Sequence, residues 1–328
     1  MKLKNIVRNA VSETQLEYGV DFQVKQTLAK PFVKWAGGKG QLIETLRPFF
    51  PDGLSSGKIK KYVEPFIGGG ALFFYIAQNY HQIEEFFISD LNPELILTYQ
   101  VIKRNAADLI LLLSGMEIEY HNKNREEQKS FFYALRGDFN AQLAHFDFEN
   151  FNDKWVERAA KIIFLNRTCF NGLFRVNSKG EFNVPFGDYK NPRICDFENL
   201  QAVSSILQRA AIICGDFTKS KDFVDSETFV YFDPPYRPIS KTSSFTSYSR
   251  FEFDDSSQRR LAEYFRILSK TGAKLMMSNS DPKNENINDN FFEDTYQGYE
   301  IQRIDANRMI NCDGEKRGKI KEIIVMNY

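Results

Sequence analysis

The sequence lacks three features that would narrow its function from composition alone: an excess of basic residues, an apolar run long enough to cross a bilayer, and a signal peptide. Its 43 lysines and arginines balance 43 aspartates and glutamates. Any binding to nucleic acid must therefore come from a local patch rather than from the charge of the whole protein. The missing apolar run and leader predict a cytoplasmic protein that has no membrane partner.

Cysteine and histidine are also scarce. The three histidines do not cluster with the cysteines, which form no Cys-x-x-Cys pair and are Cys169, Cys195, Cys214 and Cys312. We therefore expect no metal site and predict scattered reduced thiols. By contrast, a hydrophobic share of 42% over 328 residues is enough for a packed core, and the length suits one large domain that carries an insertion.

Strand and helix patterns alternate near both ends of the chain. Between Tyr62 and Asp90, a strand, a glycine turn, a helix and a second strand follow one another, which predicts the start of a doubly wound α/β sheet. The expected strands cover residues 62–66, 86–89, 211–214, 228–232, 274–277 and 323–326, and the expected helices cover residues 41–49, 71–79 and 255–269.

The middle of the chain has a different pattern. Residues 93–165 carry apolar side chains at three- and four-residue spacing, which predicts helices, and residues 166–193 are rich in Asn, Gly, Arg and Lys with interleaved aromatics. The sequence thus predicts one α/β domain that is split by an insertion. The predicted parts are a loosely ordered arm or short helix at residues 1–30, the core domain at residues 31–92 and 201–328, and a mostly helical insertion at residues 93–200.

Two glycine-rich turns could receive a ligand. The first surrounds Lys39 but lacks the spacing of a phosphate-binding loop, so a plain tight turn remains an alternative. The second, Gly68 to Gly70, follows a strand and opens a helix, where free backbone N–H groups can meet a ligand. Asp90 ends the next strand, where a carboxylate can accept both hydroxyls of a ribose. Together these features favour a nucleoside cofactor over a buried turn with a solvated aspartate.

The most specific motif is the run of Asp233, Pro234, Pro235 and Tyr236, which follows an apolar strand. Two prolines hold the chain extended and donate no N–H, so their carbonyls stay free to accept hydrogen bonds. The Asp233 carboxylate and the Pro234 carbonyl could therefore accept both hydrogens of an amino group, while Tyr236 offers a ring face to a base. A proline-rich turn capped by an aspartate is the alternative.

A local basic run interleaved with aromatics lies in the 166–193 segment despite the zero net charge. An arginine fork suits the O6 and N7 atoms of guanine, and apolar side chains suit a thymine methyl group. This segment therefore favours contact with DNA, and a solvated basic loop is the alternative. The basic residues are Arg167, Arg175, Lys179, Lys190 and Arg193.

With these motifs, the sequence resembles the Dam-type family of site-specific DNA adenine-N6 methyltransferases. It is most similar to the modification enzymes of GATC-type restriction systems, over nearly the whole chain from Pro31. The markers of the resemblance are residues 34–39, 64–70, 89–92, 170–177, 181–187, 215–217, 233–236, 244–248 and 317–328.

The resemblance implies a Rossmann-like doubly wound mixed sheet, the fold of S-adenosylmethionine-dependent methyltransferases, with a mostly helical target-recognition insertion. It implies methyl transfer from S-adenosylmethionine to N6 of an adenine that has flipped out of double-stranded DNA. Catalysis would depend on Asp233, Pro234, Pro235 and Tyr236. The residues implied at the cofactor are Trp35, Lys39, Glu64, Phe66, Gly68, Gly70, Asp90, Asp216, Phe217 and Asp233.

The resemblance also implies which residues meet DNA. Phe170 would act as a wedge beside the vacated base, and Arg175 would read a guanine edge. Leu173 and Pro185 would lie against a thymine methyl group. The other residues implied at DNA are Lys34, Arg167, Asn171 and Lys190.

One position departs from the family pattern. Asp188 stands where relatives usually carry a basic residue, and a carboxylate near phosphates repels them. Lys190 or Arg193 could take over that contact, so the recognition sequence is less strongly indicated than the chemistry.

Other functions stay open at this stage. Acidic-Pro-Pro-aromatic runs serve planar amino groups in general, so RNA or a protein amide could be the substrate, but the basic insertion favours duplex DNA. A catalytically silent DNA-binding protein is disfavoured by the intact Asp233 and Tyr236, and a nicotinamide-dependent oxidoreductase by the missing third glycine. We expect a monomer that modifies GATC sites as part of a restriction–modification system.

Overall fold

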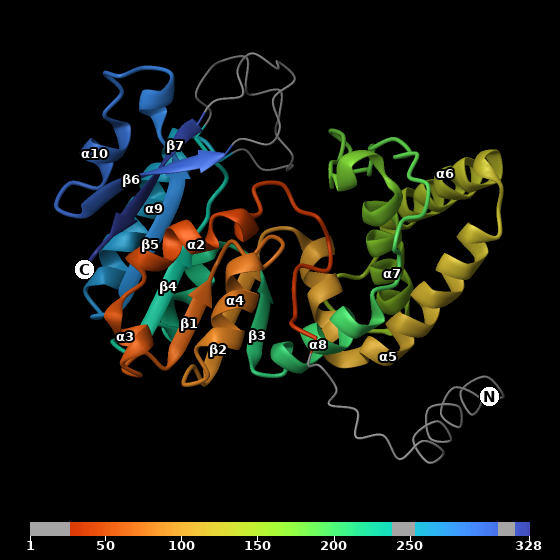
Figure 1. Cartoon of the computed structure of the whole chain (residues 1–328), viewed down its shortest axis with the longest axis horizontal. Coiled ribbons are helices and arrows are strands. Elements are labelled where there is room, and N and C mark those ends of the chain that lie inside the picture. Colours follow the sequence, from red (N-terminus) through yellow and green to blue (C-terminus); the bar gives the residue numbers. More distant parts are fainter. Residues whose placement is uncertain (1–26, 238–252, 308–318) are drawn as a thin grey trace.

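The structure is a computed structural model that describes residues 27–237, 253–307 and 319–328. An α/β part and a mostly helical part lie side by side, as Figure 1 shows. Most of the predicted N-terminal arm, Cys312 and the family markers at residues 244–248 and 317–318 lie outside the described residues. No helix within the described ranges is long and apolar enough to cross a membrane.

The described strands form one seven-stranded sheet with the order β3-β2-β1-β4-β5-β7-β6. The five strands from β3 to β5 are parallel to one another, whereas β7 runs antiparallel to β5 and β6. This mixed doubly wound sheet confirms the predicted fold class. The strands are β1 (Lys61–Glu64), β2 (Glu85–Asp90), β3 (Ala210–Cys214), β4 (Thr228–Phe232), β5 (Lys274–Ser280), β6 (Glu300–Asn307) and β7 (Lys319–Met326).

The helices follow the predicted division into flanking helices and a helical middle segment. The predicted helices at residues 71–79 and 255–269 are present with those bounds, whereas residues 41–49 form three short helical turns. The helices and 3₁₀ turns are η1 (Lys39–Gln41), α2 (Ile43–Leu46), η2 (Arg47–Phe49), α3 (Asp52–Ser55), α4 (Ala71–Asn79), α5 (Pro93–His121), α6 (Arg125–Gln142), η3 (Leu143–His145), α7 (Asp153–Thr168), η4 (Phe170–Gly172), α8 (Phe197–Leu207), η5 (Phe217–Phe223), α9 (Asp255–Ser269), η7 (Pro282–Asn284) and α10 (Phe291–Thr295).

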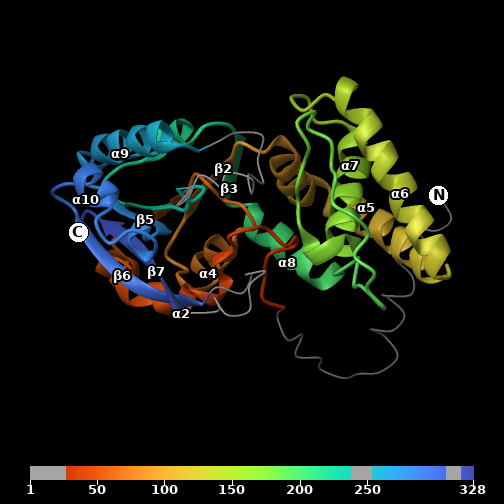
Figure 2. The ribbon, with the colours of Figure 1, turned by 90° about the horizontal axis from the view of Figure 1, so that it is seen from above.

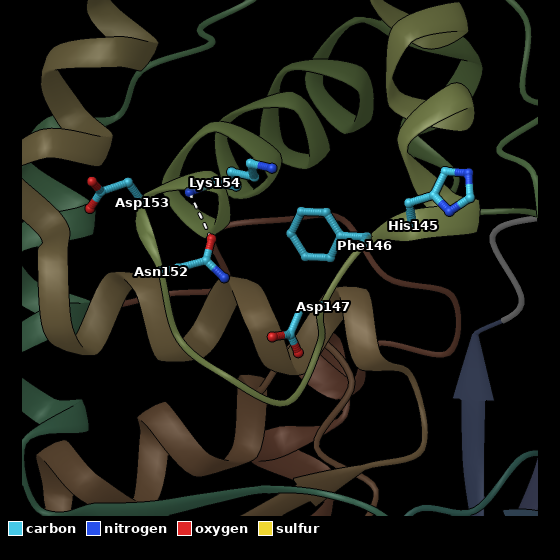
Figure 3. Close-up of a pocket in the computed structure, with 6 residues that line it drawn as sticks. All are labelled: His145, Phe146, Asp147, Asn152, Asp153 and Lys154. Carbon is cyan, nitrogen blue, oxygen red and sulfur yellow. Dashed lines mark hydrogen bonds between the residues drawn. The ribbon is translucent and has the colours of Figure 1, made fainter.

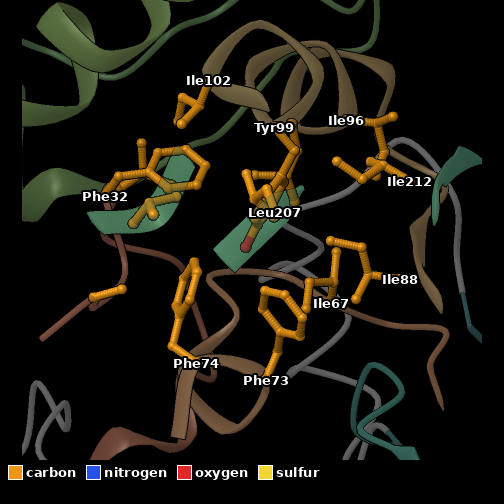
Figure 4. Packing of buried hydrophobic residues seen from close by; sticks show 14 of the residues in the cluster. Phe32, Ile67, Phe73, Phe74, Ile88, Ile96, Tyr99, Ile102, Leu207 and Ile212 are labelled. Carbon is orange, nitrogen blue, oxygen red and sulfur yellow. The ribbon is translucent and has the colours of Figure 1, made fainter. Parts of the chain in front are cut away.

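Alternating side chains of the sheet divide the core into two layers, because successive residues of a strand point to opposite faces. Tyr62 and Tyr231 pack with α4, α5 and α8, whereas their neighbours Val63 and Phe232 pack with α9. Figure 4 shows the first layer from close by, and Figure 2 shows α4 and α9 on opposite sides of the sheet. The sheet is therefore covered on both faces, as its apolar strands require.

Helix α5 connects the two parts of the molecule. It packs against β2, β3 and α8 of the α/β part and against α6 and α7 of the helical part, and a non-helical residue, Asn105, interrupts it. The fully buried Arg158 of α7 donates from Nε to Glu94 of α5 at 2.8 Å, and its guanidinium lies 4.1 Å from the centroid of the Phe139 ring. The boundary predicted at residue 93 stays a prediction.

Candidate active site

Three acidic side chains lie at the carboxyl ends of three adjacent parallel strands. Glu64 ends β1, Asp90 ends β2, and Asp233 directly follows β4. In the sheet, β1 lies between β2 and β4, and the chain reverses its winding direction between β1 and β4. Open α/β sheets bind ligands in the crevice at this switch point. The topology therefore assembles side chains that are up to 169 residues apart in the sequence, since 233 minus 64 is 169.

A buried lysine lies at the centre of this end of the sheet. Lys39 is only 4% exposed, and its Nζ donates to Asp233 Oδ1 and to the Tyr236 hydroxyl, both at 2.7 Å. The same ammonium lies 4.6 Å from the centroid of the Tyr236 ring. The sequence placed Lys39 at the cofactor, whereas the structure brings it against the Asp-Pro-Pro-Tyr run. The Asp233 carboxylate and the Tyr236 ring thus already hold a nitrogen donor.

Strand β5 supports Asp233 from behind. Ser278 donates from Oγ to Asp233 Oδ1 at 3.2 Å, and the same Oγ lies 2.8 Å from the Tyr231 hydroxyl. Burial raises the pKa of Asp233, while the charge and hydrogen bond of Lys39 oppose that increase. Lys39 therefore favours the ionised carboxylate, which is the form that accepts hydrogen bonds with both oxygens.

The two prolines leave one carbonyl available. The Pro235 carbonyl accepts a hydrogen bond from Gln258 Nε2 at 3.0 Å. No hydrogen bond to the Pro234 carbonyl is found among the described residues. Arg237, the next residue after Tyr236, binds Asp255 at 2.6 Å and Asp289 at 2.7 Å and holds the end of the run in place. Pro234 therefore presents a fixed acceptor beside the Asp233 carboxylate.

Glu64 lies within the same cluster as a buried carboxyl group. It is 3% exposed and accepts a hydrogen bond from the Tyr62 hydroxyl at 2.6 Å. Burial raises the pKa of Glu64 to about 8, and the charge of Asp233 adds to the increase. A second ionised carboxylate beside Asp233 is thereby disfavoured.

The turn after β1 forms a cradle at the end of β2. Gly68 donates its N–H to Asp90 Oδ2 at 3.1 Å and accepts from the Tyr99 hydroxyl at 3.1 Å. Gly70 has a left-handed φ of 73°, and a side chain there would collide with the Tyr99 hydroxyl. Asp90 is partly exposed, with burial raising its pKa and backbone N–H groups lowering it. Its free surface and the helix start beyond Gly70 fit a ribose and an adenosyl group.

Aromatic rings border this cradle. The Phe66 ring centroid lies 5.5 Å from that of Phe217, which is buried under Tyr264. Burial raises the pKa of Asp216, but hydrogen bonds from Arg260 and Thr218 outweigh it and leave that pKa below its usual value. Both oxygens of Asp216 accept from the Arg260 guanidinium, at 3.0 and 2.7 Å. Asp216 therefore holds the loop after β3, and Phe66 and Phe217 form an apolar border suited to a purine ring.

Trp35 connects the cradle with the insertion. Its side chain packs over Gly68 and Gly69, whose missing side chains leave room for it. On its other side, the Trp35 ring stacks on Phe174, with centroids 5.2 Å apart and planes inclined by 22°. Figure 1 shows the segment before α2, in red, running between the α/β part and the helical part.

Most residues predicted to meet DNA lie on the surface of the segment after α7. Phe170 is 52% exposed although it is a large apolar residue, and it extends from a turn in which Asn171 has a positive φ of 58°. Leu173 is half-buried. The other exposed members of the predicted set are Lys34, Asn171, Arg175, Pro185 and Lys190.

Arg167 is the member of the predicted set that the structure places elsewhere. It is half-buried, and its guanidinium donates to the Phe32 carbonyl at 2.9 Å. Burial lowers the pKa of Arg167, and the charge of Asp196 opposes that decrease. Arg167 therefore supports the segment before α2 from within, and a contact with DNA is less favoured for it than for Arg175.

A short hairpin presents Arg175. Val176 pairs with Phe182, and Asn183 Oδ1 accepts from Arg175 Nε at 2.8 Å. Asn140 of α6 holds the hairpin by exchanging hydrogen bonds with the Phe182 backbone, at 2.8 and 3.1 Å. Because Nε is used within the hairpin, the outer edge of the Arg175 guanidinium stays available for a base.

Asp188, the residue that departs from the family pattern, is paired with a basic side chain. Its carboxylate forms an ion pair with Arg125 at the start of α6, and Arg125 also donates to the Tyr189 carbonyl at 3.2 Å. Asp188 itself has a positive φ of 59°. The predicted repulsion between Asp188 and phosphate is thus reduced by Arg125, and Lys190 nearby is exposed.

Three side chains of this end of the sheet were not predicted from the sequence. They are Ser278 on β5, Gln258 on α9 and the buried Glu322 on β7, which interacts with Tyr236. Ser278 and Glu322 could have been identified as polar residues next to apolar strand residues, as Glu322 is before Ile323 to Met326.

A cavity of about 340 Å³ lies elsewhere, in the helical part. Figure 3 shows its lining residues, which come from the connection between α6 and α7 and from the start of α7 and include His145, Asp147 and Lys154. None of the predicted site residues lines this cavity. Among the described residues, no group of His, Cys, Asp and Glu side chains could hold a metal ion.

A family model described as "D12 class N6 adenine-specific DNA methyltransferase" matches residues 35–310. The chain belongs to this family. The match includes the glycine cradle, Asp90, the segment after α7 and the Asp-Pro-Pro-Tyr run. The predicted reaction, methylation of adenine N6 in DNA with S-adenosylmethionine as the donor, is thereby confirmed at the level of the D12 family.

Individual relatives of this D12 methyltransferase extend over nearly its whole length. It is 50% identical to the type II methyltransferase M.MjaIII of Methanocaldococcus jannaschii over 91% of this chain and 99% of the relative. It is 41% identical to the type II methyltransferase M1.LlaDCHI of Lactococcus lactis, over 91% and 95% of the two chains. A DNA adenine methylase of Haemophilus influenzae is 34% identical over 90% and 93%. The roles of single residues stay predictions.

Proposed function

We propose that this D12 methyltransferase methylates adenine N6 in duplex DNA at a short specific site, GATC, as the modification enzyme of a restriction–modification system. The observation that carries the proposal is the nitrogen donor held between Asp233 and Tyr236, next to the glycine cradle. The type II names of two relatives support the restriction–modification context. We also propose that a monomer acts, in the cytoplasm.

The proposed mechanism begins with the target base. An adenine that leaves the duplex stacks on the Tyr236 ring, and Phe170 fills the gap that it leaves. Unstacking costs a few kcal/mol, which contacts with the base and the DNA backbone offset. The Lys39 ammonium then yields its position, because the adenine amino group needs the same Asp233 oxygen.

Asp233 and Pro234 orient the amino group. The carboxylate and the carbonyl each accept one N–H, which withholds the nitrogen lone pair from the ring and directs it out of the plane. S-adenosylmethionine supplies a methyl group that is already activated on a sulfonium centre. Glu64, Phe66, Gly68, Gly70 and Asp90 would hold it, and Phe217 would border its adenine ring. Positioning therefore dominates the rate. The N–C bond would form as the bond between the sulfonium sulfur and the methyl carbon breaks, so that S-adenosylhomocysteine leaves. The methylated nitrogen would lose one proton toward the Asp233 carboxylate, which already accepts its N–H, and from there to solvent.

Recognition of the site is assigned to the segment after α7. Arg175 has a free guanidinium edge for guanine, and Leu173 and Pro185 offer apolar surface to a thymine methyl group. Lys34 and Lys190 are exposed where phosphates would pass. Asp188 stands where relatives usually carry a basic residue, but its ion pair with Arg125 offsets its negative charge, so this segment can still bind DNA.

A panel of duplexes tests the proposal. One duplex carries GATC and the others carry each single-base variant, and methylated adenines are mapped after incubation with labelled S-adenosylmethionine. We expect GATC to be modified fastest and each variant at least about fivefold more slowly, because a wrong base pair costs about 1–3 kcal/mol. Equal modification of several variants would contradict GATC recognition, and modification of single-stranded RNA alone would contradict duplex DNA as the substrate.

A further inference from the structure

We propose that Asn166 is a positioning residue that couples binding of the cofactor to binding of DNA. It ties the backbone beside the glycine cradle to the turn that carries Phe170. This inference rests on the proposed function, because that function places the cofactor at the cradle that Trp35 covers and DNA at the 170–175 segment.

Asn166 uses every hydrogen-bonding atom of its side chain. It lies at the end of α7 and is 1% exposed. Its Oδ1 accepts from the Lys34 N–H at 2.8 Å, while its Nδ2 donates to the Lys34 carbonyl and the Gly172 carbonyl, both at 2.9 Å. One side chain therefore joins two backbone segments that lie 138 positions apart, since 172 minus 34 is 138.

Only a carboxamide provides this set of bonds. It has one acceptor and two donor hydrogens in a plane, which match one N–H and two carbonyls. An aspartate of the same size keeps the acceptor but loses both donors, and it places a second oxygen against two buried carbonyls. The Asn166→Asp substitution therefore breaks the connection with almost no change in volume.

Further contacts join the same two segments. The Trp35 ring stacks on Phe174, at 5.2 Å between centroids. Gly172 has a left-handed φ of 65°, and a side chain at this position would collide with that of Lys34. The two segments thus form a joint, defined by Lys34, Trp35, Asn166, Gly172 and Phe174.

Each side of this joint leads to one of the two ligands. On one side, Trp35 covers Gly68 and Gly69 of the cradle. On the other side, the turn carries the exposed Phe170 and continues to the hairpin with Arg175. A ligand that fixes one side also fixes the other, so the second ligand binds a site that is already ordered. Such coupling must be reciprocal for the two ligands.

Asn199 offers a matched control. It is a fully buried asparagine of α8 that holds Lys30 in the same way, accepting from the Lys30 N–H at 2.9 Å and donating to its carbonyl at 3.0 Å. Asn199 forms no hydrogen bond with the 170–175 segment. Asn199→Asp therefore breaks a similar clamp on Lys30, four residues before the Lys34 that Asn166 holds, without touching the joint.

The experiment measures the dissociation constant of S-adenosylhomocysteine, which cannot react, by calorimetry with and without the duplex that the wild-type enzyme methylates fastest. For the full-length wild type, we expect the duplex to tighten binding at least about fivefold. The ratio of the dissociation constant without duplex to that with duplex measures the coupling. We expect this ratio to fall to within about twofold of one in Asn166→Asp and to be retained in Asn199→Asp. Thermal melting of both variants checks that they fold.

Gly172→Ala keeps the test decisive if Asn166→Asp does not fold, because it disturbs the joint through Lys34 and leaves the carboxamide intact. A wild-type ratio of one, or a folded Asn166→Asp or Gly172→Ala that keeps the wild-type ratio, would overturn the inference. Loss of the ratio in Asn199→Asp as well would also overturn it, because any buried clamp would then have the same effect. A wild-type enzyme that methylates no duplex would instead refute the proposed function.

Discussion

The carboxyl end of the sheet and the 170–190 segment of the insertion hold their polar side chains in different ways. At the sheet, Lys39 and Glu64 are at most 4% exposed, and the pKa of Asp233 and that of Glu64 are raised by burial. In the 170–190 segment, Arg175 and Lys190 are exposed, and local hydrogen bonds mainly hold the backbone.

This difference matches two kinds of task. Buried charges that face one another keep a fixed geometry and a tuned protonation state, which chemistry on an amino group requires. Exposed donors on a held backbone stay free to exchange water for base edges and phosphates. Substitutions at the sheet should therefore change turnover or stability, and substitutions in the 170–190 segment should change affinity and selectivity.

The largest effect is expected from Asp233→Ala. It removes an acceptor for the amino group and leaves the buried Lys39 ammonium without its carboxylate. We expect kcat/KM to fall by about 10³-fold, which is the upper end of the range for one preorganised group, and duplex affinity to stay within about threefold. Methyl incorporation and equilibrium binding measure the two quantities. Asp225→Ala, before β4 instead of after it, is the control that should keep activity, and retained turnover in Asp233→Ala would refute the assignment.

Glu64→Gln should change the pH dependence of stability. The pKa of Glu64 is about 8 in the folded protein and 4.5 for an ordinary glutamate. Between these values the unfolded chain releases a proton that the folded protein keeps, so stability is lost as pH rises through this window. We expect the free energy of unfolding of the wild type to fall by up to a few kcal/mol more than that of Glu64→Gln between pH 5 and pH 8.5.

Urea denaturation of the unliganded protein at several pH values measures this difference. Glu157→Gln, which changes an exposed glutamate of α7, should follow the wild-type curve. Parallel curves for the wild type and Glu64→Gln would show that Glu64 is ionised in the folded protein.

Arg175→Ala should weaken selective binding by about 1–3 kcal/mol, the value of one bidentate contact with guanine. The expected signature is a smaller ratio between affinities for GATC and for a single-base variant, measured by fluorescence anisotropy at one salt concentration. Lys179→Ala in the same hairpin should lower both affinities equally. An unchanged ratio in Arg175→Ala would show that a residue other than Arg175 recognises the guanine.

The smallest effect is expected from Asp188→Asn. The ion pair between Asp188 and Arg125 is exposed, and such pairs contribute about 1 kcal/mol or less. Loss of the carboxylate should leave the melting temperature nearly unchanged and tighten duplex binding by less than about tenfold, because one negative charge leaves the DNA surface. A large loss of binding would show instead that Asp188 itself contacts DNA.

The elements that carry the site could be predicted from the sequence because each has a local signal. Helix α4 begins after three glycines, and β4 is an apolar run that Asp233 directly follows. Strand β6 was missed because it lies at the edge of the sheet, where Ile304 and Ala306 are its buried apolar residues. The strand patterns placed Asp90 and Asp233 at strand ends, where the structure has them.

Contacts between distant segments could not be predicted in this way. The sequence contains no local sign that Lys39 would lie on Asp233, or that Ser278 would support it, because those contacts depend on the order of the strands. Arg167 appeared as part of a basic run, but the backbone turns its side chain toward Phe32. Residue type and spacing thus indicate which chemistry is present, and the topology decides which groups meet.

The pair of Arg158 and Glu94 has a consequence for engineering new sequence specificities. Exchange of the helical part between related enzymes is an obvious route, but a junction within α5, after Glu94, would leave Glu94 with the recipient while Arg158 would come from the donor. A donor without an arginine at this position would leave a buried carboxylate alone among aromatic rings, at a cost of about 3–5 kcal/mol. Chimeras that carry Glu94 and Arg158 together, or replace both by apolar residues, are therefore the ones to build first.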